Sequence, residues 1–335
     1  MNRSKQKRMG KNTIIVLLVS LVLAPVHLAK AQQEAKVAKI GWLGARPAAT
    51  AAEQRELLGR EFRALGYVEG KNIAFDYRYA DNKLDRLPAL ADELVRSKVD
   101  VLVTTSTAET LAAKNATRTI PIIFLGTGDP VATGIVDSLA RPGGNITGFT
   151  TIAPVLAGKR LELLKETVPK LSRVAVLWNP QIPGVESQWK ESQLAALELG
   201  LQLHSMEVRS ANDFESAFKE ATKKGSAALT VTGSPFNNSY QKRIAELAIK
   251  NRLPAIYTRA DYVESGGLMS YGTDFAEAYR RLASMVDKVL KGTKPADIPV
   301  EQPKKFELMI NLKAAKQIGL AIPPNVLVRA DRVIK

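Results

Sequence analysis

Apolar positions follow two alternating spacings from residue 36 onward. Short runs rich in β-branched residues predict strands, and longer segments with apolar positions three and four residues apart predict helices. This alternation is typical of an α/β fold with mainly parallel sheets. In the first half we expect strands at 38–44, 72–80, 100–107 and 120–126, and helices at 50–67, 84–99 and 108–117.

After residue 151 the same rhythm restarts, which predicts a second lobe similar to the first. We expect helices at 157–168, 186–200, 213–225 and 239–252, and strands at 173–180, 201–208, 227–234 and 253–258.

The last segments, 266–292 and 297–323, are too short for a third domain and must add elements to the first two. The chain would then cross between two Rossmann-like lobes more than once and leave a hinged inter-lobe cleft. We expect lobe 1 to comprise residues 36–150 plus 273–302, and lobe 2 residues 151–272 plus 303–335.

The N-terminus has the pattern of a signal peptide. Five basic residues precede an apolar run at 13–26, and small residues at 29 and 31 mark a cut after Ala31. The run is shorter than the roughly 20 apolar residues that span a bilayer. No cysteine is present to carry a lipid. We expect residues 1–31 to be removed and the remaining chain to be free in a periplasm, and not a lipoprotein.

The net charge is +15, and it falls to +9 without residues 1–31, which hold six basic residues and no acidic ones. The remaining Lys and Arg are interspersed with acids, and no aromatic-basic motif occurs, so we expect no nucleic-acid partner. Because disulfides are permitted outside the cytosol, a chain without cysteine needs an adequate apolar core.

Residues that carry chemistry are scarce. His204 is the only histidine after Ala31, and it falls within a predicted strand. There is no Gly-x-Ser-x-Gly elbow, no P-loop lysine and no cluster with metal-ligand spacing. We therefore expect a protein that is not an enzyme and has no cofactor and no metal.

Neutral polar residues recur where the predicted strands end. In open α/β sheets ligands bind beyond the carboxyl ends of strands, near the N-termini of helices. A capping role competes with ligand contact at Asp129, which would cap a helix starting at Pro130, and a packing role competes at Tyr271. From these positions the candidate ligand-binding residues are Ser106, Thr107, Thr127, Asp129, Asn179, Ser234, Tyr257 and Tyr271.

Long motifs resemble a known family. They include "GDPVATGIVDSLARPGGNITGFT", "GKRLELLKETVPKLSRVAVLWNP" and "YRYADNKLDRLPALADELVRSKVDVLV". These segments are similar to the ABC transporter substrate-binding proteins whose better-understood members bind tryptophan and other aromatic amino acids. The likeness extends over residues 39–334. It implies a type I periplasmic binding protein fold, a monomer and permease membrane subunits as partners.

The resemblance also implies roles for residues. Hydroxyl and main-chain N–H groups of Ser106, Thr107, Gly126 and Thr127 would take a ligand carboxylate. Asp129 or Asp274 would meet an α-ammonium group, and the choice between them stays open. The segments "TTSTAET" and "TGSPFN" depart from the family's usual form beside the ligand, so the ligand's identity is not implied.

The expected function is therefore the extracytoplasmic solute-binding component of an ABC importer. It would capture a small molecule, an amino acid or a related compound, between its lobes. One alternative is a ligand-sensing subunit of the same fold that serves a signalling partner. A second alternative, from another class, is a secreted α/β hydrolase that relies on His204.

Overall fold

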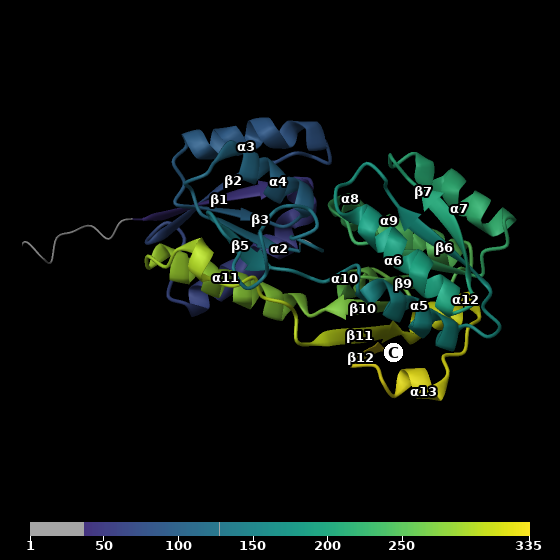
Figure 1. The fold of residues 1–335 in the computed structure, drawn as a ribbon. Coiled ribbons are helices and arrows are strands. Elements are labelled where there is room, and N and C mark those ends of the chain that lie inside the picture. The colour runs from purple at the N-terminus through teal and green to yellow at the C-terminus, as the bar shows by residue number, and fades with distance from the viewer. Residues whose placement is uncertain (1–36, 127) are drawn as a thin grey trace, which may run out of the picture.

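The computed structural model describes residues 37–126 and 128–335 of the chain. Its elements form two lobes, each built on its own sheet (Figure 1). The first sheet has the strand order β2-β1-β3-β4-β5, and the second has the order β12-β11-β10-β9-β8-β6-β7. All pairs are parallel except β10 with β11. The predicted α/β class with two lobes is confirmed.

Helices cover both faces of the first sheet. Apolar side chains of α2 and α11 pack on one face, and those of α3 and α4 pack on the other. The elements of this lobe are β1 (Ala38–Gly44), η1 (Ala48–Ala51), α2 (Ala52–Ala64), β2 (Ile73–Tyr79), η2 (Leu84–Arg86), α3 (Leu87–Arg96), β3 (Val101–Thr104), α4 (Thr107–Ala116), β4 (Ile122–Leu125), β5 (Ile146–Phe149), α11 (Phe275–Leu290) and η3 (Pro295–Asp297).

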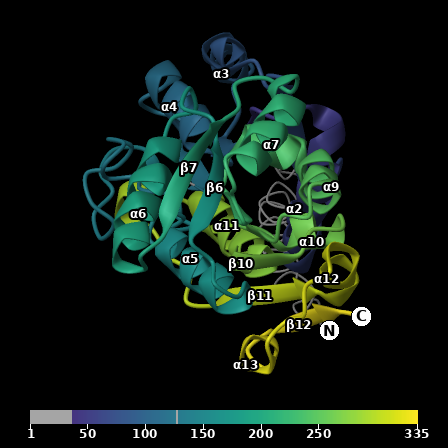
Figure 2. The same cartoon turned by 90° about the vertical axis from the view of Figure 1, so that its right-hand side faces the viewer.

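The second sheet is covered in the same way, with α7 and α9 on one face and α5, α6 and α12 on the other. Figure 2 shows the C-terminal elements along one edge of this lobe. The elements are α5 (Leu156–Thr167), β6 (Arg173–Trp178), α6 (Val185–Glu198), β7 (Gln202–Glu207), α7 (Asp213–Lys223), β8 (Ala228–Val231), α8 (Pro235–Ser239), α9 (Gln241–Lys250), β9 (Ala255–Tyr257), α10 (Ala260–Glu264), β10 (Met269–Thr273), β11 (Phe306–Asn311), α12 (Leu312–Ile318), α13 (Pro324–Leu327) and β12 (Arg332–Ile334).

Three connections join the lobes within the described residues. The chain leaves the first sheet after β5, returns to it between β10 and α11, and enters the second sheet again at β11. Helix α11 follows β10 directly, yet its apolar face belongs to the core of the first lobe (Figure 1). The ends of the strands of both lobes therefore meet at the junction, which is where the expected cleft would lie.

Local structure differs from the prediction after the fourth strand. Asp129 and Pro130 do not start a helix, because residues 130–134 form a single turn. Gly134 at the end of this turn has a φ of +67°, a left-handed conformation that stops helix growth. The short strands β5 and β12 were not predicted.

No helix in the described part of the chain is long and apolar enough to cross a membrane. The predicted signal peptide at residues 1–31 lies outside the described residues.

Candidate functional site

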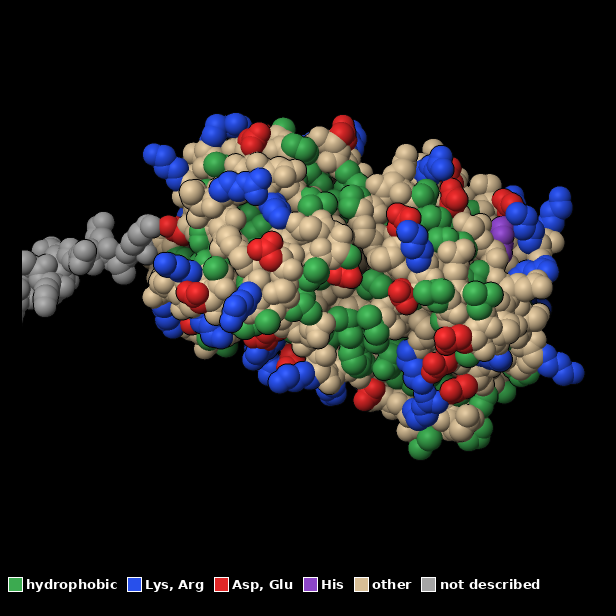
Figure 3. All heavy atoms as spheres, in the orientation of Figure 1, with side chains coloured by type: hydrophobic (Ala, Val, Ile, Leu, Met, Phe, Trp, Pro, Cys, Tyr) green, Lys and Arg blue, Asp and Glu red, His purple; other side chains and the backbone are tan. Residues whose placement is uncertain are grey.

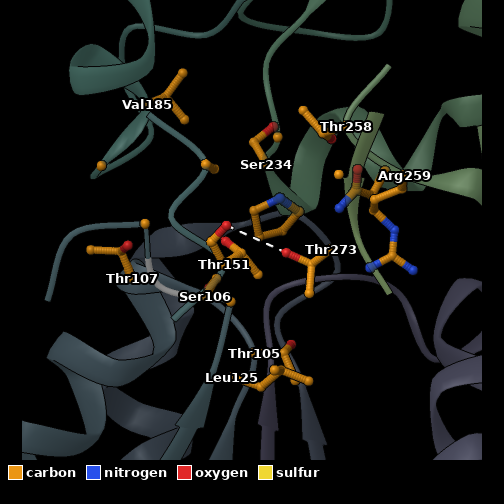
Figure 4. Close-up of a pocket in the computed structure, with 18 of the residues that line it drawn as sticks. Thr105, Ser106, Thr107, Leu125, Thr151, Val185, Ser234, Thr258, Arg259 and Thr273 are labelled. Atoms are coloured by element: carbon orange, nitrogen blue, oxygen red, sulfur yellow. Dashed lines mark hydrogen bonds between the residues drawn. The ribbon is translucent and has the colours of Figure 1, made fainter. Parts of the chain in front are cut away.

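A pocket lies between the lobes, beyond the carboxyl ends of strands from both sheets. It encloses about 900 Å³ of space, part of it open to solvent. Figure 3 shows a notch between the lobes at the upper edge of the molecule. Figure 4 shows that Ser106 and Thr107 of the first lobe and Ser234 and Thr258 of the second border the same space.

Four of the predicted site residues line this pocket: Ser106, Thr107, Gly126 and Ser234. The two serines are also helix caps, since each side chain accepts a hydrogen bond from an N–H group in the first turn of its helix, at 3.4 Å in α4 and 3.1 Å in α8. The N–H group of Gly126 donates to Phe149 O at 3.0 Å and is therefore engaged within the sheet. Thr127 lies outside the described residues.

The other predicted residues do not line the pocket. The Asn179 side chain is buried and accepts from Gln181 N at 2.9 Å. Tyr257 lies in the core of lobe 2, stacked on Tyr262 with ring centroids 4.6 Å apart. The Tyr271 ring packs against a phenylalanine ring of β11 with centroids 6.0 Å apart. In the structure these three side chains are engaged within lobe 2 and do not face the pocket.

Neither predicted acid reaches the pocket. Asp129 is exposed and caps the turn at 130–134 by accepting from the main-chain N–H groups of Val131 and Ala132. Asp274 caps α11 in the same manner, with an N–H group of that helix 2.9 Å from its carboxylate. Helix and turn capping occupies both carboxylates.

Three buried arginines that no sequence pattern had indicated line the pocket: Arg46, Arg160 and Arg259. Arg259 has an acidic partner, because its Nη2 lies 2.9 Å from a carboxylate oxygen of Asp261. Burial acts to lower the pKa of Arg259, but the Asp261 carboxylate outweighs this effect and raises it. The guanidinium also lies 3.8 Å from the centre of the Phe275 ring.

Arg46 follows β1 and reaches across to the second lobe, where its Nη2 donates to Asn238 O at 3.1 Å. Its Nε is buried and has no hydrogen-bond partner among the described residues. Burial lowers the pKa of Arg46, and the positive charge of Arg259 lowers it further. The hydroxyl group of Tyr279, also on the pocket wall, is a second buried group that lacks a partner in the described part of the chain.

Arg160 lies on α5 and bonds only to main-chain carbonyl groups in the described structure. Its Nε donates to Tyr271 O at 3.0 Å, and its two terminal nitrogens lie 3.4 and 3.5 Å from Ala153 O. Burial lowers its pKa to about 10, so the guanidinium stays charged at neutral pH.

Glu109 holds the two loops of the first lobe together beneath the pocket. Its carboxylate accepts from Ala45 N at 2.6 Å and from Thr105 N at 2.5 Å. Burial raises the pKa of this carboxyl group. The spacing of Ser106 and Glu109 matches a capping box, a signal that could have identified Glu109 from the sequence.

The two lobes also contact each other directly. Besides the bond from Arg46 to Asn238, the Ser239 hydroxyl donates to Asn82 Oδ1 at 3.1 Å. Gly184 packs so closely on Thr107 that a Cβ atom there would lie 2.8 Å from Thr107 Oγ1. These contacts describe a closed arrangement of the lobes.

The described residues of the pocket wall include no histidine and no acidic side chain. His204 lies on the edge strand β7 and does not line the pocket. Burial lowers its pKa, with a further decrease from Lys224. Within the described residues no group of three or more His, Asp or Glu side chains could hold a metal ion. The described pocket walls supply hydroxyl, amide and guanidinium groups, which can form hydrogen bonds with a ligand.

Comparisons with known proteins agree with a binding role. A sequence model of the ABC transporter substrate binding proteins matches residues 53–334. A tyrosine-binding protein of Clostridioides difficile (strain R20291) is 29% identical, over 76% of this chain and 73% of that protein.

Solved structures give the same picture. A conserved domain protein from Vibrio cholerae is 30% identical with a TM-score of 0.83, over 89% of this chain and 100% of that one. An ABC domain in complex with L-Trp from Streptococcus pneumoniae is 26% identical with a TM-score of 0.81, over 89% of this chain and 99% of that one.

Proposed function

The chain belongs to the ABC transporter substrate-binding protein family, and on that basis we propose that it captures a small carboxylate-bearing molecule, an amino acid or a related compound, in the inter-lobe pocket. The fold is that of type I periplasmic binding proteins, and the protein is the solute-binding component of an ABC transporter. The ligand class is suggested by relatives that bind tyrosine and L-Trp.

One observation carries the proposal. Hydroxyl side chains from both lobes face a single pocket at the point where α4 begins (Figure 4). The first N–H groups of a helix lack intrahelical partners, and together with nearby hydroxyl groups they suit a carboxylate. A ligand that touches both lobes stabilises their closed arrangement, since binding favours the conformation that makes more contacts.

The proposed lobes comprise residues 36–150 plus 273–302 and residues 151–272 plus 303–335. Members of this family typically act outside the cytoplasm, and substrate-binding proteins of ABC transporters dock on permease subunits. We further propose that residues 1–31 direct export to the periplasm, and that the protein acts there as a monomer without enzymatic activity and without a nucleic-acid partner.

A thermal-shift screen tests the proposed function. The protein lacking residues 1–31 is heated with amino acids, small organic acids and neutral compounds of similar size. A ligand at 100 times its dissociation constant adds about 2.7 kcal/mol to the free energy of unfolding, which raises the midpoint by several degrees. If no compound raises the midpoint, the proposal fails.

A second experiment connects binding with transport. Cells that lack the gene should lose uptake of the radiolabelled ligand found in the screen, and the intact gene should restore it. Unchanged uptake would favour the sensing alternative. For the hydrolase alternative, His204→Gln should leave the affinity for the ligand unchanged, because His204 lies away from the pocket.

A further inference from the structure

We propose that the pocket binds a small carboxylic acid that carries no ammonium group and is therefore anionic as a whole. This inference rests on the proposed function, since it specifies the charge class of the ligand held in the same pocket. It distinguishes this chain from relatives described as binding tyrosine and L-Trp, which are zwitterions.

The pocket offers no carboxylate to an ammonium group. Among the described residues, no Asp or Glu lines it. The buried acids close to the pocket already have donors, since Asp261 pairs with Arg259 and Glu109 accepts from main-chain N–H groups of two loops. An ammonium group buried here would find only carbonyl and hydroxyl oxygens, and such a charge is costly to bury without a counter-charge.

Positive charge is in excess on the pocket wall. Arg46 is 7% exposed and Arg160 is 3% exposed, and the described residues supply only main-chain carbonyl groups as their hydrogen-bond partners. The Asp261 and Glu53 carboxylates attract Arg46 without a hydrogen bond to it, but both also act on Arg259, with which Asp261 is paired. Arg160 has no acidic partner among the described residues. Because buried charges in proteins are normally paired, this excess of positive charge on one pocket indicates that a further counter-charge comes from the ligand.

Unused donors mark where that counter-charge would bind. Arg46 and Tyr279 line the same pocket, and the buried Nε of the first and the buried hydroxyl of the second have no partner among the described residues. A buried donor without an acceptor is destabilising, and a carboxylate oxygen would satisfy both groups. The N-terminus of α4, ten residues long, adds positive potential at the pocket.

The effect on ligand choice can be estimated. At an effective dielectric constant of about 20, an ammonium group about 8 Å from an unpaired guanidinium would weaken binding about thirtyfold. We therefore expect a deaminated acid to bind at least about tenfold more tightly than the amino acid with the same side chain.

Matched ligand pairs test the inference by isothermal titration calorimetry. The pairs are 3-phenylpropionate with L-phenylalanine, 3-(4-hydroxyphenyl)propionate with L-tyrosine, and 4-methylpentanoate with L-leucine. In each pair that binds, the acid without the amine should have the lower dissociation constant, and 3-phenylpropanamide, which is neutral, should bind more weakly than 3-phenylpropionate.

Arginine variants test which charge on the pocket wall produces the preference for the acid. Arg46→Gln should weaken binding of the acid about tenfold or more and reduce the preference over the amino acid. Arg96→Gln is the control, because it removes the same charge from an exposed position at the end of α3. If Arg46→Gln fails to fold, Arg160→Gln serves the same test, and thermal melting of each ligand-free variant shows which is usable.

The outcomes separate this inference from the proposed function. If an amino acid binds as tightly as its deaminated partner, or if both arginine variants retain the preference, the inference is overturned while the proposed function stands. If only neutral compounds bind, or if no compound binds, the proposed carboxylate ligand fails together with the inference.

Discussion

Replacement of Gly184 by Ala should weaken ligand binding by obstructing closure of the lobes. Gly184 precedes α6 in the second lobe and has a φ of +81°. A Cβ atom at this position would lie 2.8 Å from Oγ1 of Thr107 in the first lobe. The strain of a left-handed alanine, about 1 kcal/mol, acts whether the lobes are open or closed. The steric clash acts only when they are closed.

The clash sets the expected change in affinity. Thr107 would have to leave its preferred rotamer, at a cost of about 1 kcal/mol, or the lobes would have to stay slightly apart. Displacement of its hydroxyl from the ligand would remove a hydrogen bond that contributes about 1 kcal/mol. Together these effects predict a dissociation constant raised by roughly thirtyfold.

Affinity is measured by isothermal titration calorimetry with the compound that binds most tightly in the thermal-shift screen. Small-angle X-ray scattering measures how far the protein becomes more compact when the ligand closes the lobes. Gly200→Ala is the matched control, because Gly200 also has a positive φ, +62°, but a Cβ atom added there would meet no neighbour within 4 Å. It should lose a similar amount of stability and keep its affinity. If Gly184→Ala binds the ligand as tightly as Gly200→Ala, closure onto Gly184 is refuted.

Three further substitutions give distinct readouts. Tyr279→Phe should weaken ligand binding in a calorimetric titration. It should leave the stability of the ligand-free protein unchanged or raise it, because the buried hydroxyl has no partner among the described residues. Tyr257→Phe is the control, since it removes a similar buried hydroxyl away from the pocket and should not alter the affinity. Asp261→Asn leaves a buried arginine unpaired and should lower the free energy of unfolding in urea by about 3 kcal/mol. Hydrogen bonds from the N–H of Ser210 and its neighbour hold the pKa of Asp213 below its usual range. The resulting stabilisation is present above pH about 4 and is lost as the pH falls below it. In Asp213→Asn the urea concentration at the unfolding midpoint should therefore fall less steeply as the pH is lowered through this range than in the unchanged protein. The prediction for Asp261 is contradicted if Asp261→Asn is more stable, and the one for Tyr279 is contradicted if Tyr279→Phe binds the ligand more tightly. The prediction for Asp213 is contradicted if Asp213→Asn loses stability in acid as steeply as the unchanged protein.

Much of the fold could be predicted because apolar spacing encodes the buried face of each element. The short strand β5 was missed, since the glycine at position 148 is typical of a turn. The structure explains that glycine: a Cβ atom there would lie 2.2 Å from Phe124 O on the neighbouring strand. Such a close approach depends on strand pairing, which no local pattern reports.

The site was predictable only in part. Hydroxyl residues after strands, such as Ser106 and Ser234, follow from the rule that ligands bind at strand ends. Tyr257 occupies such an end, but its side chain points into the core. Side chains alternate between the two faces of a strand, and the sequence does not show which of the two faces Tyr257 occupies. Arg160 lies in an amphipathic helix, where a basic residue usually faces solvent, and only packing of the segments around it makes it a pocket residue.

The most direct test of the central claim is the affinity of two variants that each replace one hydroxyl by a methyl group, Thr107→Val in lobe 1 and Thr258→Val in lobe 2. Both residues line the pocket, one from each side (Figure 4). If the ligand is held between the lobes, titration calorimetry will show one ligand per chain and weaker binding in both variants. Full affinity in either variant would contradict a ligand that is clamped by both lobes.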